Sequence, residues 1–390
     1  MRVLVAPDSF GGTLSAGEAA AAIAAGWSKG APGDTVVARP LSDGGPGFVE
    51  VVRATLGGQL VPVHTRGPLG EPVEASVLLV DGVGYVECAQ ACGLQLIAPA
   101  DRDPKVTSSY GVGLLLDAAV EAGARTVVVG LGGSATNDGG AGMLAALGAG
   151  PVGTVPPGEA ASNSRSGPAG ASGTALPPGG AALRFCEGLA GVPGLRGVEL
   201  VAATDVDNRL TGLQGASAVY GPQKGATADD VQILDAALGH WAEVLERDLP
   251  GCPKGLVRLA GAGAAGGIGA ALFALGGRRE AGIGLVRRLI GFDAEVELAD
   301  LVVTGEGSFD SQSLRGKVVA GVASAASGQG LPCVVLAGQV QVGRREAAAH
   351  GVDAAYSLVE QAGSVEKAMD EAAAVLTDLA AKVAREWGGR

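Results

Sequence analysis

Short apolar segments that run into glycine-rich turns and then into helical patterns recur along the chain, and this alternation most constrains its fold. The clearest case is TVVV (126–129), an apolar strand-like segment followed directly by GLGGSATNDGGAG (130–142). Comparable segments lie at 3–6 and 35–39. Strands that alternate with helices need crossover connections and therefore pair in parallel. The sequence predicts an α/β fold.

An antiparallel element interrupts the alternation at residues 60–87. VEASVLLVDGVGYVEC (73–88) alternates with period two around Asp81-Gly82, and this pattern indicates a β-hairpin. Strands at 300–304 and 332–337 then resume the α/β series, and residues 364–387 have the apolar stripe of one amphipathic helix. Residues 150–180 are rich in Pro, Gly and Ser, which favours a disordered loop over the alternative of a lid.

Composition excludes two classes of partner. The 390 residues have a net charge of −12 and no Lys/Arg cluster, so a nucleic-acid-binding surface is not expected. The uncharged segment 259–277 is mostly Ala and Gly, too weakly apolar for a membrane helix.

The N-terminus lacks the apolar core of a signal peptide. Five scattered cysteines are typical of reduced thiols, and we expect a cytoplasmic protein.

Motifs for the commonest nucleotide sites are weak or missing. GLGGSA (130–135) and GAGAAG (261–266) have dinucleotide-type glycine spacing, but no acidic residue follows Gly130 at the distance a ribose contact needs. No P-loop, protein-kinase or serine-hydrolase motif occurs. The histidines at 64, 240 and 350 lie outside the glycine turns, so histidine-based catalysis is not indicated. A nicotinamide-dependent dehydrogenase is therefore disfavoured.

Acidic and amide side chains gather in the turns that follow predicted strands. They are Asp8, Asp43, Asn137, Asp138, Asp205, Asp207, Asn208, Glu306 and Asp310. Any one of them is as well explained by a turn or a helix cap, but five clusters together favour a Mg²⁺ site with a base that takes a hydroxyl proton. Two lysines, Lys224 and Lys317, are candidate phosphate partners or else solvated charges at helix ends.

Eight motifs in order carry a resemblance to a known family. They are APDSF, SDGGPG, TSSYGVG, GLGGSATNDGGAGM, TDVDN, YGPQKGA, GAGAAGGIGAAL and TGEGSFDSQSLRGK. Together they resemble the type I bacterial glycerate kinases. The resemblance implies transfer of phosphate from ATP with Mg²⁺ to D-glycerate, commonly giving 2-phosphoglycerate.

The resemblance also implies two α/β domains. One, flavodoxin-like with a parallel sheet, is built from residues 1–65 and 285–390. The other, a mixed α/β domain, is inserted at 66–284 and contains the 150–180 loop.

Roles at the phosphate end of the reaction are hypotheses from the residues themselves. Glycines allow backbone N–H groups to surround an anion, so we expect the ATP phosphates to meet the amides of Gly132, Gly133 and Ser134. Lys224 would lie nearby. Asp205 would hold Mg²⁺, helped by Asn137 or Asp138.

Roles at the acceptor end remain open between pairs of residues. Asp43 would accept the substrate hydroxyl proton, with Asp310 as the rival. Arg102, and next Arg315, would bind the glycerate carboxylate. Gly11 stands where the family usually has Lys, which motivates an alternative reading of the chain as a non-catalytic homologue that senses glycerate or nucleotide. The phosphorylated oxygen and the oligomeric state, a homodimer included, stay open.

Overall fold

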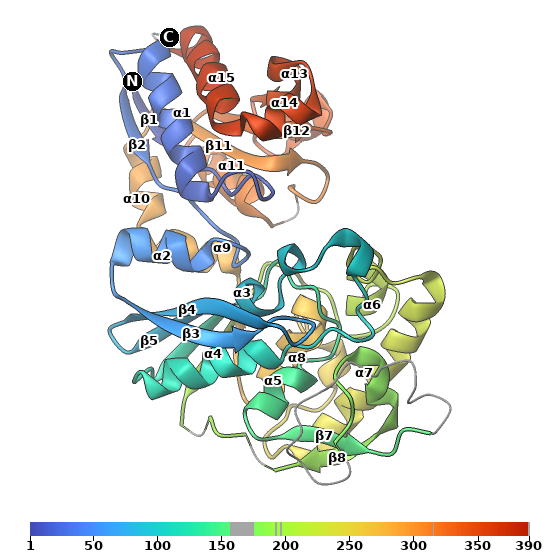
Figure 1. Ribbon diagram of the computed structural model, residues 1–390. Helices are drawn as coiled ribbons and strands as arrows, with labels where there is room; N and C mark the ends of the chain where they lie inside the picture. The colour runs from blue at the N-terminus through green and yellow to red at the C-terminus, as the bar shows by residue number, and fades with distance from the viewer. Residues whose placement is uncertain (157–174, 192, 196, 315, 389–390) are drawn as a thin grey trace. The chain divides into compact units, whose positions relative to one another are not determined.

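The computed structural model describes residues 1–156, 175–191, 193–195, 197–314 and 316–388, and these form two compact units (Figure 1). The first unit comprises Met1–Asp43, Glu50–Gly57 and Ala281–Arg390, and the second comprises Gly44–Val49 and Gly58–Glu280. The expected cuts near 65 and 285 thus compare with observed changes at 57/58 and 280/281. The sequence did not indicate that 44–49 joins the second unit.

A five-stranded parallel sheet forms the centre of the first unit. Numbered along the chain within this unit, its strands have the order 2-1-3-4-5, which is the flavodoxin-like order. In sheet order the strands are β2 (Thr35–Ala38), β1 (Arg2–Val5), β11 (Leu301–Phe309), β12 (Cys333–Val340) and β13 (Ala354–Ser357). The predicted fold class is confirmed for this part of the chain.

Helices α1 (Ala16–Gly30) and α15 (Ala372–Trp387) lie side by side over this sheet (Figure 1). α1 begins at the predicted capping box, in which Ser15 and Glu18 bond to each other's backbone N–H. The prediction of a single helix at 364–387 is wrong, because the helix is interrupted at Glu371. The remaining helices are α14 (Val365–Asp370), α9 (Gly282–Leu289), α10 (Phe292–Glu297), α11 (Val318–Gly328), α12 (Arg344–Ala349) and α13 (Leu358–Ala362). α2 (Phe48–Leu56) draws residues from both units.

A mixed six-stranded sheet forms the second unit. Four neighbouring strands run parallel and end in register, with Glu87, Gly130, Ala203 and Glu280 side by side. The predicted hairpin is confirmed: β4 and β5 pair antiparallel through Asp81 (φ 47°) and Gly82 (φ 80°), as a type I′ turn requires. In sheet order the strands are β10 (Arg278–Glu280), β9 (Glu199–Ala203), β6 (Thr126–Gly130), β5 (Val83–Glu87), β4 (Pro72–Val80) and β3 (Gln59–Arg66).

Helices around this sheet bury the apolar positions of the second unit. Trp241 of α7 (Ala228–Asp248) is fully buried and donates from Nε1 to Gly139 O at 3.0 Å. The uncharged segment 259–277 enters the buried helix α8 (Ile268–Ala274) through Gly266 and Gly267, both with positive φ. The other elements are α3 (Ala89–Cys92), α4 (Tyr110–Glu121), α5 (Ala141–Ala146), α6 (Ala216–Tyr220) and the small pair β7 (Gly150–Gly153) and β8 (Cys186–Ala190).

Two sequence expectations concern segments with little periodicity. Most of the predicted disordered loop, residues 157–174, lies outside the described residues, while 150–153 form β7. Over the described part of the chain, no helix combines the length and the apolar character that crossing a membrane would require.

Close packing of α1 on α15 predicts a specific intolerance. A Cβ at Gly26 would overlap Thr377 O and lie 2.8 Å from Ala380 Cβ. We expect Gly26→Ala to lower the free energy of unfolding by about 1–3 kcal/mol through overpacking, measured by urea unfolding. Gly328 in α11 has no atom within 4 Å of the place where a Cβ would lie, so Gly328→Ala should leave stability unchanged or raise it by up to about 1 kcal/mol. Equal effects would contradict the packing explanation.

Candidate functional site

Glycines in the stretch 130–142 are needed chiefly because other backbone segments pack against them. A Cβ at Gly130 would lie 2.5 Å from Gly44 O, and one at Gly132 would overlap Gly45. At Gly139 a Cβ would overlap the Trp241 ring. The conformation of this stretch is therefore fixed by close contacts with neighbouring segments. This close packing is a reason for the glycines that the sequence did not reveal.

Parts of the expected phosphate loop are already hydrogen-bonded within the second unit. The Gly132 N–H donates to Gly44 O at 3.1 Å, and Gly133 O accepts from Leu94 N at 2.9 Å. The Ser134 hydroxyl oxygen accepts from Lys224 Nζ at 3.0 Å. A phosphate at the Gly132 amide would have to displace the Gly44 carbonyl, so Gly133 and Ser134 are the better placed of the three predicted residues.

Lys224 is almost fully buried, with 3% of its surface exposed. Its Nζ donates to Ser134 Oγ and, at 2.6 Å, to Thr136 O. Burial lowers the pKa of Lys224 to about 8, although the nearby carboxylate of Asp138 acts to raise it. The Lys224 side chain therefore holds the loop in place through these two hydrogen bonds. The sequence had suggested either a phosphate contact or a solvated charge at a helix end, and neither includes this role.

Asp138 organises the same loop with its carboxylate. Its two oxygens accept from Ser109 N and Oγ, both at 2.8 Å, and from the N–H groups of Gly140 and Gly142, both at 3.1 Å. Burial raises the pKa of Asp138, while these hydrogen bonds lower it. Direct metal binding by Asp138 stays a prediction, and it would require the loss of some of these bonds.

Asn137 offers what Asp138 does not, a buried oxygen without a hydrogen bond. Its Nδ2 donates to Ser217 Oγ at 2.9 Å, whereas its Oδ1 is buried and unbonded. The neighbouring Thr136 Oγ1 is in the same condition. A buried polar atom left unpaired costs about 1–3 kcal/mol, so such atoms indicate a position where water, a metal or a ligand completes the structure.

The loop after β9 carries the predicted metal ligand Asp205, which is half-buried. Next to it, Asp207 pairs with Arg279 Nη2 at 2.6 Å, and Arg279 Nε is buried without a partner. Arg279 lies on β10, the strand beside β9. Sequence reasoning missed Arg279, because its burial and its pairing with Asp207 are apparent only in the structure.

Arg102 is the one of the two arginines predicted to bind the glycerate carboxylate that lies among the described residues. Arg102 Nη2 donates to Leu94 O at 3.4 Å, and its Nε is buried and unbonded. Arg102 thus lies near the segment that also bonds Gly133. Arg315 lies outside the described residues.

In the first unit, the structure brings together an acidic cluster at the carboxyl ends of β1, β2 and β11. Its members are Asp8, Asp43, Glu306 and Asp310, and the nearby Lys317 opposes the effect of their charges on one another. Burial raises the pKa of Glu306 to about 7, and burial followed by the Asp43 charge raises that of Asp8. Lys317 precedes the N-terminus of α11, where a cation is unfavourable and the carboxylates compensate it.

Gly11, at the position where the resemblance leads us to expect Lys, has an unusual backbone. Gly11 has a φ of 54°, and no atom lies within 4 Å of where its Cβ would be. A lysine would therefore have space here but would need a left-handed conformation, which is costly for residues with a Cβ.

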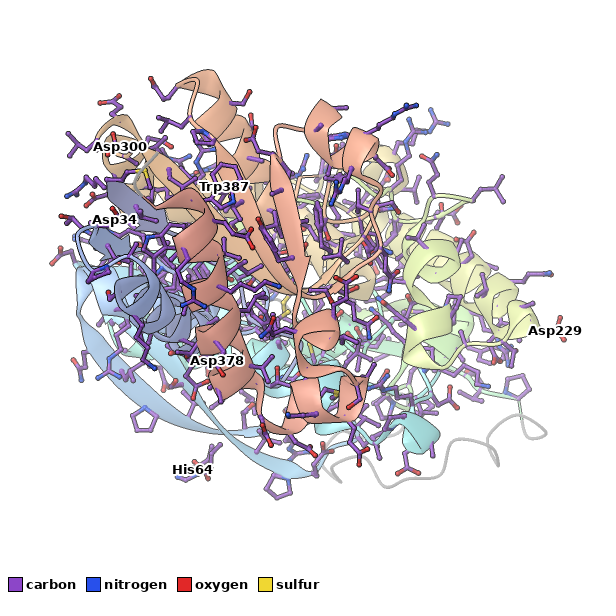
Figure 2. All side chains as sticks on the ribbon, turned by 90° about the horizontal axis from the view of Figure 1, so that it is seen from above. Asp34, His64, Asp229, Asp300, Asp378 and Trp387 are labelled. Atoms are coloured by element: carbon purple, nitrogen blue, oxygen red, sulfur yellow. The ribbon has the colours of Figure 1, made fainter. Side chains whose placement is uncertain are left out.

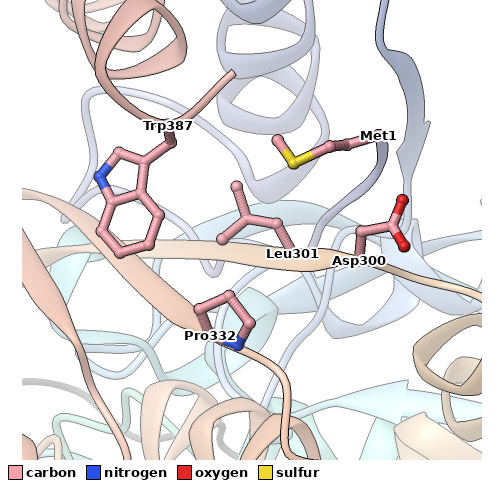
Figure 3. Close-up of a pocket in the computed structure, with 5 residues that line it drawn as sticks. All are labelled: Met1, Asp300, Leu301, Pro332 and Trp387. Atoms are coloured by element: carbon pink, nitrogen blue, oxygen red, sulfur yellow. The ribbon is translucent and has the colours of Figure 1, made fainter. Parts of the chain in front are cut away.

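One surface hollow lies apart from the acidic cluster. This hollow of about 430 Å³, lined by Met1, Asp300, Leu301, Pro332 and Trp387, is found where β1, β11 and β12 begin (Figure 3). That is the opposite edge of the sheet from the acidic cluster. His64 projects at the surface with 89% of its side chain exposed (Figure 2).

The buried Lys224 predicts a pH dependence of stability. Because its pKa is about 8 in the folded protein and 10.5 when unperturbed, the unfolded chain binds the extra proton between these values, and stability rises with pH. From pH 7.5 to 10 the wild type should gain about 2–3 kcal/mol relative to Lys224→Met, measured by urea unfolding at both pH values. Lys254→Met, which removes an exposed lysine, should show no such gain. Parallel pH profiles for wild type and Lys224→Met would contradict the burial argument.

Comparisons with known proteins agree on one family. The model of the glycerate kinase family matches residues 3–388. A glycerate kinase of Bacillus subtilis (strain 168) is 40% identical, over 98% of this chain and 97% of that protein. A glycerate 2-kinase of Escherichia coli (strain K12) is 39% identical, over 94% and 93%. A crystal structure from Salmonella typhimurium LT2, of a protein provisionally assigned as glycerate kinase 2, superposes with a TM-score of 0.74 at 38% identity and covers 99% of this chain and 98% of that one. The chain belongs to the glycerate kinase family.

Proposed function

We propose that this kinase transfers the γ-phosphate of ATP to O2 of D-glycerate and releases 2-phospho-D-glycerate. The observation that carries the proposal is the alignment of strand ends in both sheets, since this brings the family's polar motifs together at the carboxyl edge of each sheet. The name of the Escherichia coli relative, a glycerate 2-kinase, supports O2 over O3.

We assign the ATP phosphates to the amides of Gly133 and Ser134, with Gly132 available only if its bond to Gly44 opens. Lys224 contributes its charge from beneath the loop through Ser134. Mg²⁺ prefers oxygen ligands and usually keeps only one or two carboxylates from the protein. Asp205 with the unbonded Asn137 Oδ1 fits that donor set, and Asp138 would act by orienting the loop. When bound, Mg²⁺ neutralises phosphate charge that develops during transfer.

Acceptance of the substrate proton falls to a carboxylate of the acidic cluster, for which the sequence favoured Asp43 over Asp310. Asp43 ends the first of the three segments that make up the first unit, and it belongs to the same acidic cluster as Asp310. Arg102, with its unbonded Nε, remains the first choice for the glycerate carboxylate, and Arg315 the second.

One alternative has a specific observation behind it. Gly11 lacks the lysine usual in the family, and its positive φ disfavours one, so a non-catalytic homologue that senses glycerate or nucleotide is the competing function. The intact acidic cluster and the buried unbonded oxygens favour the enzyme.

We further propose that the protein acts in the cytoplasm, without a nucleic-acid or membrane partner.

A coupled assay for ADP release in the presence of D-glycerate separates these functions. We expect glycerate-dependent turnover and a phosphorus NMR signal of 2-phosphoglycerate. Binding of glycerate without turnover would favour the sensor. A signal from 3-phosphoglycerate would retain the kinase and correct the position of transfer.

The metal assignment predicts the effect of one substitution. We expect Asp205→Asn to raise the Mg²⁺ concentration for half-maximal activity at least about tenfold and to lower kcat about 100-fold. Stabilisation of the folded protein by Mg²⁺ and ATP against heat, a measurement independent of turnover, should weaken in parallel. Asp229, an exposed residue of α7, provides the control Asp229→Asn. An unchanged Mg²⁺ dependence in Asp205→Asn would remove Asp205 from the metal site.

Restoring the usual lysine gives a further test. Because residue 11 has a φ of 54°, Gly11→Lys should lower the free energy of unfolding by about 1–2 kcal/mol. If the missing charge limits phosphate binding, the KM for ATP should fall at the same time. A KM for ATP that is unchanged would show that this chain does not need a cation at position 11.

A further inference from the structure

Glu306 occupies the switch point of the flavodoxin-like sheet. β1 and β11 are neighbours in the sheet, and from them the chain continues to β2 on one side and β12 on the other. Ligands of open α/β sheets bind at the carboxyl ends of the strands where the order reverses in this way. The β1–β11 register pairs Val5 with Val303, and the Asp8 N–H donates to Gly305 O at 2.8 Å. Asp8 therefore continues the ladder beside Glu306.

The Glu306 side chain is held in place on a rigid strand. Only 8% of the residue is exposed. A Cβ at the preceding Gly305 would overlap Leu336 O, and one at the following Gly307 would lie 3.0 Å from Gly11 N. Gly307 thus allows the loop after β1 to lie close to β11, and Gly305 allows the close approach of the neighbouring strand β12.

One oxygen of this carboxylate has no partner. Glu306 Oε1 is buried and accepts no hydrogen bond. By contrast, Asp310 Oδ1 accepts from Gln312 N at 2.7 Å and Ser313 N at 3.3 Å, and Asp8 Oδ1 accepts from Ser9 N at 2.7 Å. Within the acidic cluster, Glu306 thus combines burial with an identified oxygen that can accept a proton from a ligand.

We propose that Glu306 is the group that accepts the proton of the glycerate hydroxyl during phosphoryl transfer. The inference rests on the proposed function and assigns the base that the sequence left open between Asp43 and Asp310. The proton passes from the hydroxyl oxygen to Glu306 Oε1 while that oxygen forms a bond to the γ-phosphorus. The bond between the γ-phosphorus and the β–γ bridging oxygen breaks, and its electron pair leaves with ADP.

The surroundings of Glu306 suit a base that works near neutral pH. Burial is the main cause that raises its pKa to about 7, the charges of Asp310 and Asp43 add to the rise, and Ser313 and Lys317 oppose it. The Glu306 charge in turn raises the pKa of Asp8, which follows β1. A base is most effective when its pKa lies near the working pH.

The test compares rate–pH profiles of wild type and Glu306→Gln. Since the carboxylate must be deprotonated to act, kcat/KM of the wild type should rise with pH and level off above about 7. We expect Glu306→Gln to lower kcat about 100- to 10,000-fold, to change the KM for glycerate less than about threefold, and to abolish this rise. Glu306→Asp should recover part of the rate with a shifted midpoint. That recovery separates a chemical role from a structural one.

Glu87 provides a matched control in the second unit. It is 5% exposed and its pKa is also raised to about 7 by burial, but its Oε2 accepts from Gly47 N and Val49 N. Because its folded pKa is above the unfolded value, its stabilising contribution is complete below pH 4.5 and is lost as pH rises through 7. Glu87→Gln should therefore remove about 3 kcal/mol of pH-dependent stability and leave the rise in kcat/KM in place.

Several outcomes would overturn the assignment. Glu306→Gln could keep more than about a tenth of kcat with the acidic limb unchanged, or Asp43→Asn could abolish that limb instead. A changed Mg²⁺ requirement in Glu306→Gln with an intact limb would make Glu306 a metal ligand. Infrared titration of the wild type against Glu306→Gln should show one carboxyl that loses its proton near pH 7, and its absence would also count against the assignment. A wild type without glycerate-dependent ADP release would instead overturn the proposed function.

Discussion

Parallel main-chain hydrogen bonding is the constraint on which both halves of this molecule depend. Parallel strands that pair in register end at the same edge of a sheet, so the turns that follow them must gather there. In the second unit this aligns the ends of β5, β6, β9 and β10. In the first it joins β1 to β11, which lies near the other end of the chain. Turns with ordinary local sequences become neighbours only because these ladders hold.

The loop after β6 shows how such an edge becomes rigid. Lys224 and Asp138 are both buried, and the charged groups of both form hydrogen bonds within the loop region. Glycines bring the segment 44–45 against Gly130 and Gly132. Fixed donors and oxygens need no reorganisation when a charged ligand arrives, which is how preorganised sites stabilise charge. The unbonded oxygens of Thr136 and Asn137 remain as the exception.

The first unit holds the opposite arrangement, a group of like charges that is costly to keep together. Burial raises the pKa of both Asp8 and Glu306, and the charges of neighbouring carboxylates add to the rise, so ionising either group in the folded protein lowers stability. Folding elsewhere in the unit, such as the close packing of α1 on α15, offsets this cost. Concentrated destabilisation of this kind is common where a protein performs chemistry.

The sequence by itself determined the class of fold, the hairpin at Asp81-Gly82, the capping box at Ser15 and the family, because each depends on short-range periodicity, turn chemistry or motif order. It also placed polar residues after the right strands. Tertiary structure decided what each polar atom does. Lys224 and Asp138 looked like ligand contacts in sequence but are bonded inside the protein, while Arg279 and the free oxygen of Glu306 became apparent only through burial and pairing. Burial and hydrogen-bond partners come from segments far apart in the chain, and no local pattern encodes them.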